Sequence, residues 1–278
     1  MTDFRQIPSV SDLLLTPAVE ELLRTHPRKL VVDTIRQVLD DLRASLRAAP
    51  NSSPDLSPSA IGLLVQNAIA ESVRPSLCEA VNATGVILHT SLGRAPLAQE
   101  ALRAVHDAAA AYCPLEVDVQ SGKRGSRTTH VERLLCSLTG AEAALVVNNN
   151  AAAVLLVLQA LAQGKEVIVS RSQLVEIGGS FRMPDVMAQS GAKLVEVGTT
   201  NKTYLSDYRN AIADNTALLL KVHASNFRIT GFTAEVSIEE LMSLGRERGI
   251  PVAYDIGSGA LRDLSAFGLA SEPLVMHS

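Results

Sequence analysis

The sequence has no tryptophan, and aromatic residues make up only 3% of its 278 positions. Its core must therefore be built from aliphatic side chains, because aromatic anchors are scarce. Cys78, Cys113 and Cys136 show neither a Cys-x-x-Cys spacing nor histidines at zinc-ligand intervals, so neither a disulfide framework nor a metal site is indicated. Lys and Arg number 25 against 29 Asp and Glu, and a net charge of -4 gives no global basic surface for nucleic acid.

Long apolar runs are also missing. The longest, residues 151–162, contains Gln159 and is far shorter than the ~20 residues that span a bilayer. The first ten residues, MTDFRQIPSV, lack the basic region and apolar core of a signal peptide. We therefore expect a cytoplasmic protein with no membrane partner.

The first 75 residues show a helical pattern. Apolar residues recur at three- and four-residue steps on both sides of Pro27, which predicts two amphipathic helices, and a third is expected over residues 60–72. Residues 49–59 are rich in Pro, Ser and Asn and predict a linker. Basic residues outnumber acidic ones from Arg24 to Arg47, which is typical of a solvated helix face, with a nucleic-acid contact as the alternative.

Residues 76–278 predict an α/β domain with a largely parallel sheet, because short apolar runs alternate there with helical segments. Gly164, Gly191 and Gly249 follow three of these helices, where a left-handed C-terminal cap is expected. The expected strands are Val86–His89, Ala143–Val147, Glu166–Ser170, Lys193–Val197, Ala217–Val222 and Val252–Asp255. The expected helices are Pro96–Ala111, Val131–Thr139, Ala151–Gln163, Pro184–Gln189, Leu205–Ala213 and Ser237–Arg248.

Three asparagines, residues 148–150, stand between an apolar run and a strong helix-forming segment. Polar groups at the carboxyl end of a strand and the amino end of a helix favour an anion such as phosphate, because the first N–H groups of a helix lack intrahelical acceptors. The alternative is structural, with Asn150 capping the helix and Asn148 and Asn149 forming the turn. The segment lacks the glycine patterns of dinucleotide-binding and P-loop sites.

Asp255 ends a buried-looking strand and precedes a Gly-Ser-Gly turn. A carboxylate in this position can pair with a protonated ring nitrogen and keep a pyridinium charged. It can equally bind the N–H groups of its own turn.

Arginines beside glycines form a further pattern. Arg94 follows Gly93, and Arg127 ends the loop GKRGSR over residues 122–127. Glycine lets a ligand approach the backbone, and arginine binds phosphate or carboxylate through two N–H groups. Together with residues 221–226 at another strand end, they indicate an anion-binding pocket.

These segments resemble bacterial selenocysteine synthases, the L-seryl-tRNA(Sec) selenium transferases, which are pyridoxal phosphate enzymes of the aspartate aminotransferase fold. The resemblance covers essentially the whole chain and is carried above all by NATGVILHTSLGRAPL, residues 82–97, and by residues 121–156, 166–203 and 215–233. It implies a fold type I large domain, a small N-terminal helical domain that grips tRNA, and a ring-shaped homo-oligomer with active sites between subunits. Ammonia lyases that act on phosphorylated amino sugars are related but generally lack such an N-terminal domain.

The resemblance also implies roles for individual residues. The helix start after residue 148 would hold the cofactor phosphate, two later strand ends would face the ring, and two arginines would bind selenophosphate or its phosphate group. By position, the cofactor residues are Asn149, Asn150, Ala151, Ala152, His223 and Asp255, and the anion-binding residues are Arg94 and Arg127.

The implied reaction starts from tRNA(Sec) charged with serine. Its amino group forms an aldimine with pyridoxal phosphate, the α-proton and the hydroxyl are lost, and selenium from selenophosphate adds to the aminoacrylyl-tRNA. No metal is expected. Asp255 supports this chemistry because a protonated ring withdraws electrons from the reacting carbon.

One feature departs from the family pattern, in which the lysine that binds the cofactor follows the ring-nitrogen aspartate. No lysine follows Asp255 in these residues, and Lys221 precedes it, which makes it a poor substitute. We therefore expect a truncated chain that lacks the C-terminal part of the fold and is inactive alone. The alternatives are a non-catalytic tRNA-binding or oligomer-interaction protein, and a pyridoxal phosphate lyase or transferase that acts on a small amino acid.

Overall fold

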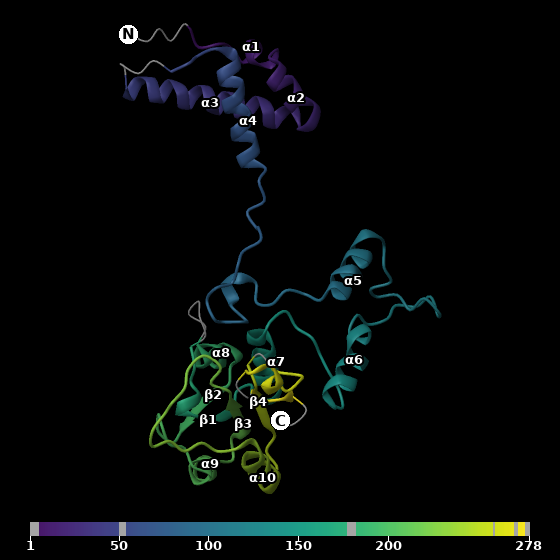
Figure 1. Ribbon diagram of the computed structural model, residues 1–278. Helices are drawn as coiled ribbons and strands as arrows, with labels where there is room; N and C mark the ends of the chain where they lie inside the picture. Colours follow the sequence, from purple (N-terminus) through teal and green to yellow (C-terminus); the bar gives the residue numbers. More distant parts are fainter. Residues whose placement is uncertain (1–5, 50–53, 177–181, 258, 270–271, 276–278) are drawn as a thin grey trace. The chain divides into compact units, whose positions relative to one another are not determined.

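The computed structural model describes residues 6–49, 54–176, 182–257, 259–269 and 272–275. The chain divides into two compact units, Met1–Ala104 and Val105–Ser278. Figure 1 shows a group of helices at the start of the chain and, in its second half, a sheet flanked by helices.

The first unit begins with four helices that share one apolar core. Pro17 occupies the first turn of the second helix, where its missing N–H costs no hydrogen bond, and Ser9 caps the first helix by accepting from the N–H of Asp12. The helices are α1 (Val10–Leu14), α2 (Pro17–Thr25), α3 (Arg28–Ala48) and α4 (Pro58–Ser72). Their buried residues are Leu13, Val19, Leu22, Val31, Ile35, Val38, Leu39, Ile61, Val65 and Ile69.

The helix break at Pro27 is confirmed, since α2 ends at Thr25 and α3 begins at Arg28. The segment before it forms two helices where the sequence predicts one, because a proline disfavours helical backbone in the residue before it and Pro17 therefore starts a new helix. Part of the expected linker, residues 50–53, lies outside the described residues.

Residues 71–150 contain helices but no buried residue. The helices are α5 (Gln99–Ala110) and α6 (Thr129–Thr139), with a short 3-10 turn, η2, at Thr90–Leu92. The predictions of strands at Val86–His89 and Ala143–Val147 are wrong: neither segment pairs with a strand in the described chain, and Ile87 and Leu145 are exposed. A strand forms only where a neighbour takes up its backbone hydrogen bonds.

The second unit contains a four-stranded parallel sheet. Its strands are β1 (Glu166–Ser170), β2 (Lys193–Val197), β3 (Thr216–Val222) and β4 (Val252–Asp255), in the spatial order β2-β1-β3-β4. Because β2 and β3 lie on opposite sides of β1, the chain reverses its direction of travel across the sheet at β1. Ligands of open parallel sheets collect at the carboxyl ends of the strands near such a reversal.

Helices cover both faces of this sheet. On one face, α7 (Asn150–Ala162) and α8 (Met183–Ser190) pack against Val167, Val169, Leu218 and Leu220. On the other face, α9 (Leu205–Ala211) and α10 (Ile238–Arg248) pack against Ile168 and Leu219. Alternate residues of β3 therefore face opposite helical layers, as the two-residue period of a strand requires.

The strand boundaries of this sheet agree closely with those predicted from the sequence. Three of the four strands have the expected bounds, and β3 begins one residue earlier. The glycine caps are confirmed, because Gly164, Gly191 and Gly249 all have positive φ. Two further 3-10 turns, η3 (Arg171–Gln173) and η4 (Ser265–Phe267), complete the elements.

Candidate functional site

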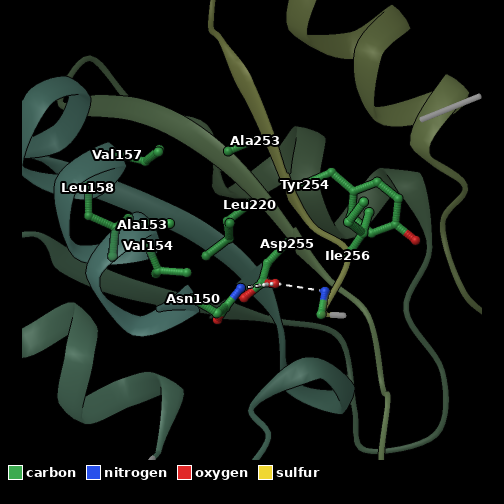
Figure 2. Close-up of a pocket in the computed structure, with 11 residues that line it drawn as sticks. Asn150, Ala153, Val154, Val157, Leu158, Leu220, Ala253, Tyr254, Asp255 and Ile256 are labelled. Atoms are coloured by element: carbon green, nitrogen blue, oxygen red, sulfur yellow. Dashed lines mark hydrogen bonds between the residues drawn. The ribbon is translucent and has the colours of Figure 1, made fainter. Parts of the chain in front are cut away.

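A pocket lies where the amino end of α7 meets the carboxyl ends of β3 and β4 (Figure 2). Its volume is about 170 Å³. The helix contributes one amide and four apolar side chains, and the strands contribute an aspartate and apolar residues. The lining residues are Asn150, Ala153, Val154, Val157, Leu158, Leu220, Ala253, Tyr254, Asp255, Ile256 and Gly257.

Asp255 and Asn150 meet in this pocket although 105 positions separate them. The amide Nδ2 of Asn150 donates to Oδ1 of Asp255 at 3.0 Å, and the backbone N–H of Gly257 donates to the same oxygen at 2.9 Å. Within the described part of the chain, Oδ2 of Asp255 has no hydrogen-bond partner. The carboxylate is therefore oriented through Oδ1 by two N–H donors.

Asp255 makes one local contact and one long-range contact. The contact with Gly257 is the turn contact that an aspartate at a strand end makes on structural grounds alone. The contact with Asn150 is not local, and it fixes a 9% exposed carboxylate against the start of a helix.

The amino end of α7 is formed by the asparagine segment. Asn149 is the capping residue: its Oδ1 accepts from the backbone N–H of Ala152 at 2.9 Å. Asn150, the residue that the structural alternative assigns to the cap, is instead the first residue of the helix, and its side chain reaches Asp255. Helix geometry leaves the N–H groups of Asn150 and Ala151 without an intrahelical acceptor, which suits an anion.

His223 follows β3 and lies beside the aspartate. Its backbone N–H donates to the carbonyl oxygen of Asp255 at 2.8 Å, and its Nε2 lies 3.1 Å from Oε2 of Glu272. The turn after Asp255 is close to this segment, since a Cβ on Gly257 would lie 3.3 Å from Cβ of Ser225. Gly257 also has a φ of 68°, so a side chain there would be strained as well as crowded.

Lys221 lies on the opposite face of the sheet. Its Nζ donates to Oε1 of Glu235 at 2.5 Å and to the carbonyl of Val236 at 2.7 Å, and it lies 5.8 Å from the centre of the Tyr254 ring. Figure 2 shows the Tyr254 side chain pointing away from Asn150 and Asp255. Burial raises the pKa of Tyr254, and nearby carboxylates, Glu235 first among them, raise it further. Lys221 is therefore engaged away from the pocket.

The two predicted anion-binding arginines lie in different units. Arg94 belongs to the first unit and has a φ of 64°, and it is the non-glycine residue with a positive φ in the described chain. Such strain in a bulky residue is found most often at functional positions. Arg127 belongs to the second unit and does not line the pocket.

Arg127 and Arg124 both bind Glu116. Nε of Arg127 donates to Oε1 at 2.8 Å and Nη2 of Arg124 donates to Oε2 at 2.8 Å. The Arg127 hydrogen bond, followed by its charge, lowers the pKa of the Glu116 carboxyl. The loop that the sequence marks as glycine- and arginine-rich is thus a hairpin held by two ion pairs.

Several contacts are not visible in the sequence. Glu272 and Gln173 each bind a residue beside the site from 49 positions away, and no spacing or motif marks them. In the described chain no group of three or more His, Cys, Asp or Glu side chains could hold a metal ion. No described helix is both long and apolar enough to cross a bilayer.

Two known protein families match segments of this chain. The family described as L-seryl-tRNA selenium transferase matches residues 80–278, and the one described as selenocysteine synthase N terminal matches residues 4–43. The chain belongs to the L-seryl-tRNA selenium transferase family. The resemblance inferred from the residue segments is confirmed by this match.

Curated members of the family cover the whole chain. The L-seryl-tRNA(Sec) selenium transferase of Geobacter sulfurreducens is 57% identical over 277 residues, which are 100% of this chain and 60% of the relative. That of Moorella thermoacetica is 55% identical over 271 residues, which are 98% of this chain and 57% of the relative. The chain therefore spans about 60% of the length of these relatives.

A solved structure supports the fold. The structure of D-glucosaminate-6-phosphate ammonia-lyase matches with a TM-score of 0.56 and 22% identity, over 72% of this chain and 54% of that chain. With the parallel sheet between two helical layers, this likeness confirms the predicted fold class, an α/β large domain of the aspartate aminotransferase type.

Proposed function

We propose that this chain provides the tRNA-binding and cofactor-binding parts of an L-seryl-tRNA(Sec) selenium transferase, which converts seryl-tRNA(Sec) to selenocysteinyl-tRNA(Sec) with selenophosphate. The observation that carries the proposal is the Asn150–Asp255 contact in a pocket at the carboxyl edge of the sheet. The relatives named for this reaction match the chain along its whole length and are themselves longer, so the activity is that of a longer protein.

The pocket residues fit pyridoxal phosphate. Asp255 is buried, is held through Oδ1 by two N–H donors, and keeps Oδ2 for the N–H of a protonated ring. When bound, the cofactor supplies a charged ring that withdraws electrons from the α-carbon of an attached amino acid and so acidifies its α-proton. The role of Asp255 is to hold that ring proton in place.

The remaining proposed cofactor residues lie at the start of α7 and just after the end of β3. The N–H groups of Asn150 and Ala151 at the start of α7 would bind the phosphate, and Asn149 fixes this first turn by accepting the N–H of Ala152. His223 is held to β4 through its backbone N–H and would approach the ring from the end of β3. Asn150 orients Asp255 and in this way couples the phosphate end of the site to the ring end.

The covalent link to the cofactor requires a lysine, and no lysine lines the pocket in the described chain. Lys221 is engaged by Glu235 and Val236 on the other face of the sheet. In this proposal the linking lysine is therefore none of the six in these 278 residues, and the chain alone binds the cofactor without a covalent bond.

The partners in this proposal are seryl-tRNA(Sec), selenophosphate and further copies of the chain in a ring. Residues 1–75 bind the tRNA, supported by the family match over residues 4–43, and residues 76–278 form the cofactor domain. Arg94 and Arg127 bind selenophosphate or its phosphate group. Within α3, Lys29 and Arg36 pair with Asp33, and Arg43 pairs with Asp40, so part of the basic run is engaged by carboxylates of its own helix.

Equilibrium dialysis of the 278-residue chain with pyridoxal phosphate tests the cofactor site. We expect saturable binding that Asp255→Ala weakens by about tenfold or more, since a hydrogen bond to a charged group is lost. Asp263→Ala is the matched control, because Asp263 is an exposed aspartate that binds only its own turn through Ser265. Equal affinity of the two variants would overturn the assignment.

Borohydride reduction followed by mass spectrometry tests whether any lysine of this chain forms the covalent link to the cofactor. We expect no cofactor adduct on this chain, whereas an adduct on Lys221 would contradict the lysine assignment. Since Lys221 is occupied elsewhere, a non-catalytic tRNA-binding role for this chain is the second candidate. Preferential binding of selenocysteine tRNA without cofactor binding would favour it.

A further inference from the structure

Gln173 occupies a gap in the sheet beside the site. The ladder between β1 and β3 ends with Val169 opposite Leu220, because β1 ends at Ser170 and the chain turns into η3, while β3 continues to Val222. The backbone N–H of Val222 thus extends past the paired length of β1. The side-chain Oε1 of Gln173 accepts it at 3.0 Å, and Gln173 is 4% exposed. One side chain therefore replaces the missing strand.

The orientation of this amide is fixed at its other end. Nε2 of Gln173 lies 3.4 Å from Oε1 of Glu235, the oxygen that also accepts from Lys221. Lys221 is 6% exposed and binds the Val236 carbonyl as well. An amide with its nitrogen toward a carboxylate and its oxygen toward a backbone N–H has both ends satisfied, so a flipped amide would lose both contacts.

The contact at Val222 is adjacent to the cofactor site. The next residue, His223, donates its backbone N–H to the carbonyl of Asp255 at 2.8 Å. The Val222 side chain is buried in the core beneath α7. The end of β3 is thus held from the side of β1 by Gln173 and from the side of β4 by Asp255, one residue apart.

We propose that Gln173 is a positioning residue for His223: by holding the Val222 N–H where β1 has ended, it fixes the strand end that presents the imidazole to the cofactor ring. The contact of His223 with the ring rests on the proposed function. The hydrogen bond by which Gln173 positions the strand end does not rest on the proposed function, because all of its atoms belong to this chain.

The imidazole NMR signals of the cofactor-free 278-residue chain test this inference. The His223 signal is assigned by its loss in His223→Gln. We expect Gln173→Met, which is similar in length but has no acceptor, to shift or broaden the His223 signal. Gln189→Met, an exposed amide of α8, is the matched control and is expected to leave it unchanged.

Cofactor binding provides the second readout. We expect Gln173→Met to raise the dissociation constant for pyridoxal phosphate by roughly tenfold, and Gln189→Met to leave it unchanged. If the unmodified chain binds no cofactor, the proposed function fails while the NMR result still decides the role of Gln173. An unchanged His223 signal in a folded Gln173→Met variant overturns the inference.

If Gln173→Met does not fold, hydrogen exchange of the unmodified chain provides another test of the inference. We expect the Val222 amide to be protected like the amides of the β3 interior. Exchange of that amide as fast as in the loop that follows, residues 224–230, would contradict the contact on which the inference rests.

Discussion

Two stretches of this chain contain many leucines and valines yet differ in what those residues do. Between residues 150 and 255, Ile168 and Leu218 are fully buried between sheet and helices. Between residues 71 and 149, Leu134 and Leu145 are both 60% exposed, and no residue is buried. Helices form in both stretches, but strands form only in the first. A helix satisfies its backbone within one segment, whereas a strand needs a partner.

The largest expected contrast is in amide hydrogen exchange. The amides of β1 and β3 are paired in the sheet and buried, so they exchange only through unfolding. We expect them to exchange at least about 1000-fold more slowly than the amides of Ala143–Val147. Mass spectrometry of exchanged peptides measures this ratio. Equal protection of the two regions would show that residues 143–147 are paired in solution.

A pair of leucine substitutions sharpens the same comparison. Leu218→Ala removes a fully buried side chain from β3 and is expected to lower the free energy of unfolding by about 2–5 kcal/mol. Leu134→Ala makes the same chemical change on the exposed surface of α6 and is expected to alter it by no more than about 0.5 kcal/mol. Urea unfolding followed by circular dichroism measures both. A large loss for Leu134→Ala would place that residue in a core.

The smallest expected effect concerns pH and the Glu116 hairpin. Because Arg127 and Arg124 lower the pKa of Glu116 in the folded chain, the stabilisation is present above the ordinary carboxyl value of 4.5 and is lost as pH falls through the lowered value. We expect the Gly125 amide, which donates to the Glu116 carbonyl, to lose protection over this acidic range. Glu116→Gln should remove the pH dependence. A titration at the ordinary value would mean that the ion pairs do not form.

The sheet could be predicted closely from sequence because each strand is a short run rich in apolar residues between helical segments. β1, β2 and β4 have their expected bounds, each followed or preceded by a helix with a clear period. The apolar runs at Val86–His89 and Ala143–Val147 give the same local signal. What differs is the presence of a neighbouring strand, and a local pattern does not contain that information.

The site was predictable in part for the same reason. Asn150 and Asp255 lie at the ends of elements, and the parallel topology brings such ends to one edge of the sheet. Gln173 and Glu272 reach the site through side-chain contacts that span 49 residues each. A buried glutamine has no periodicity or motif of its own, so its role follows only from the point at which β1 leaves the sheet.

Strand β4 lies at the edge of the sheet, and among the described strands it pairs with β3 alone. Four residue pairs set this alignment, from Leu219 opposite Val252 to Val222 opposite Asp255. A slip of one residue would exchange the faces of the Tyr254 and Asp255 side chains and turn Asp255 toward Lys221, because neighbouring side chains of a strand point to opposite faces. The carboxylate in the pocket thus depends on the alignment of two short strands, and mispairing there would remove the charge from the proposed cofactor site without any change of sequence.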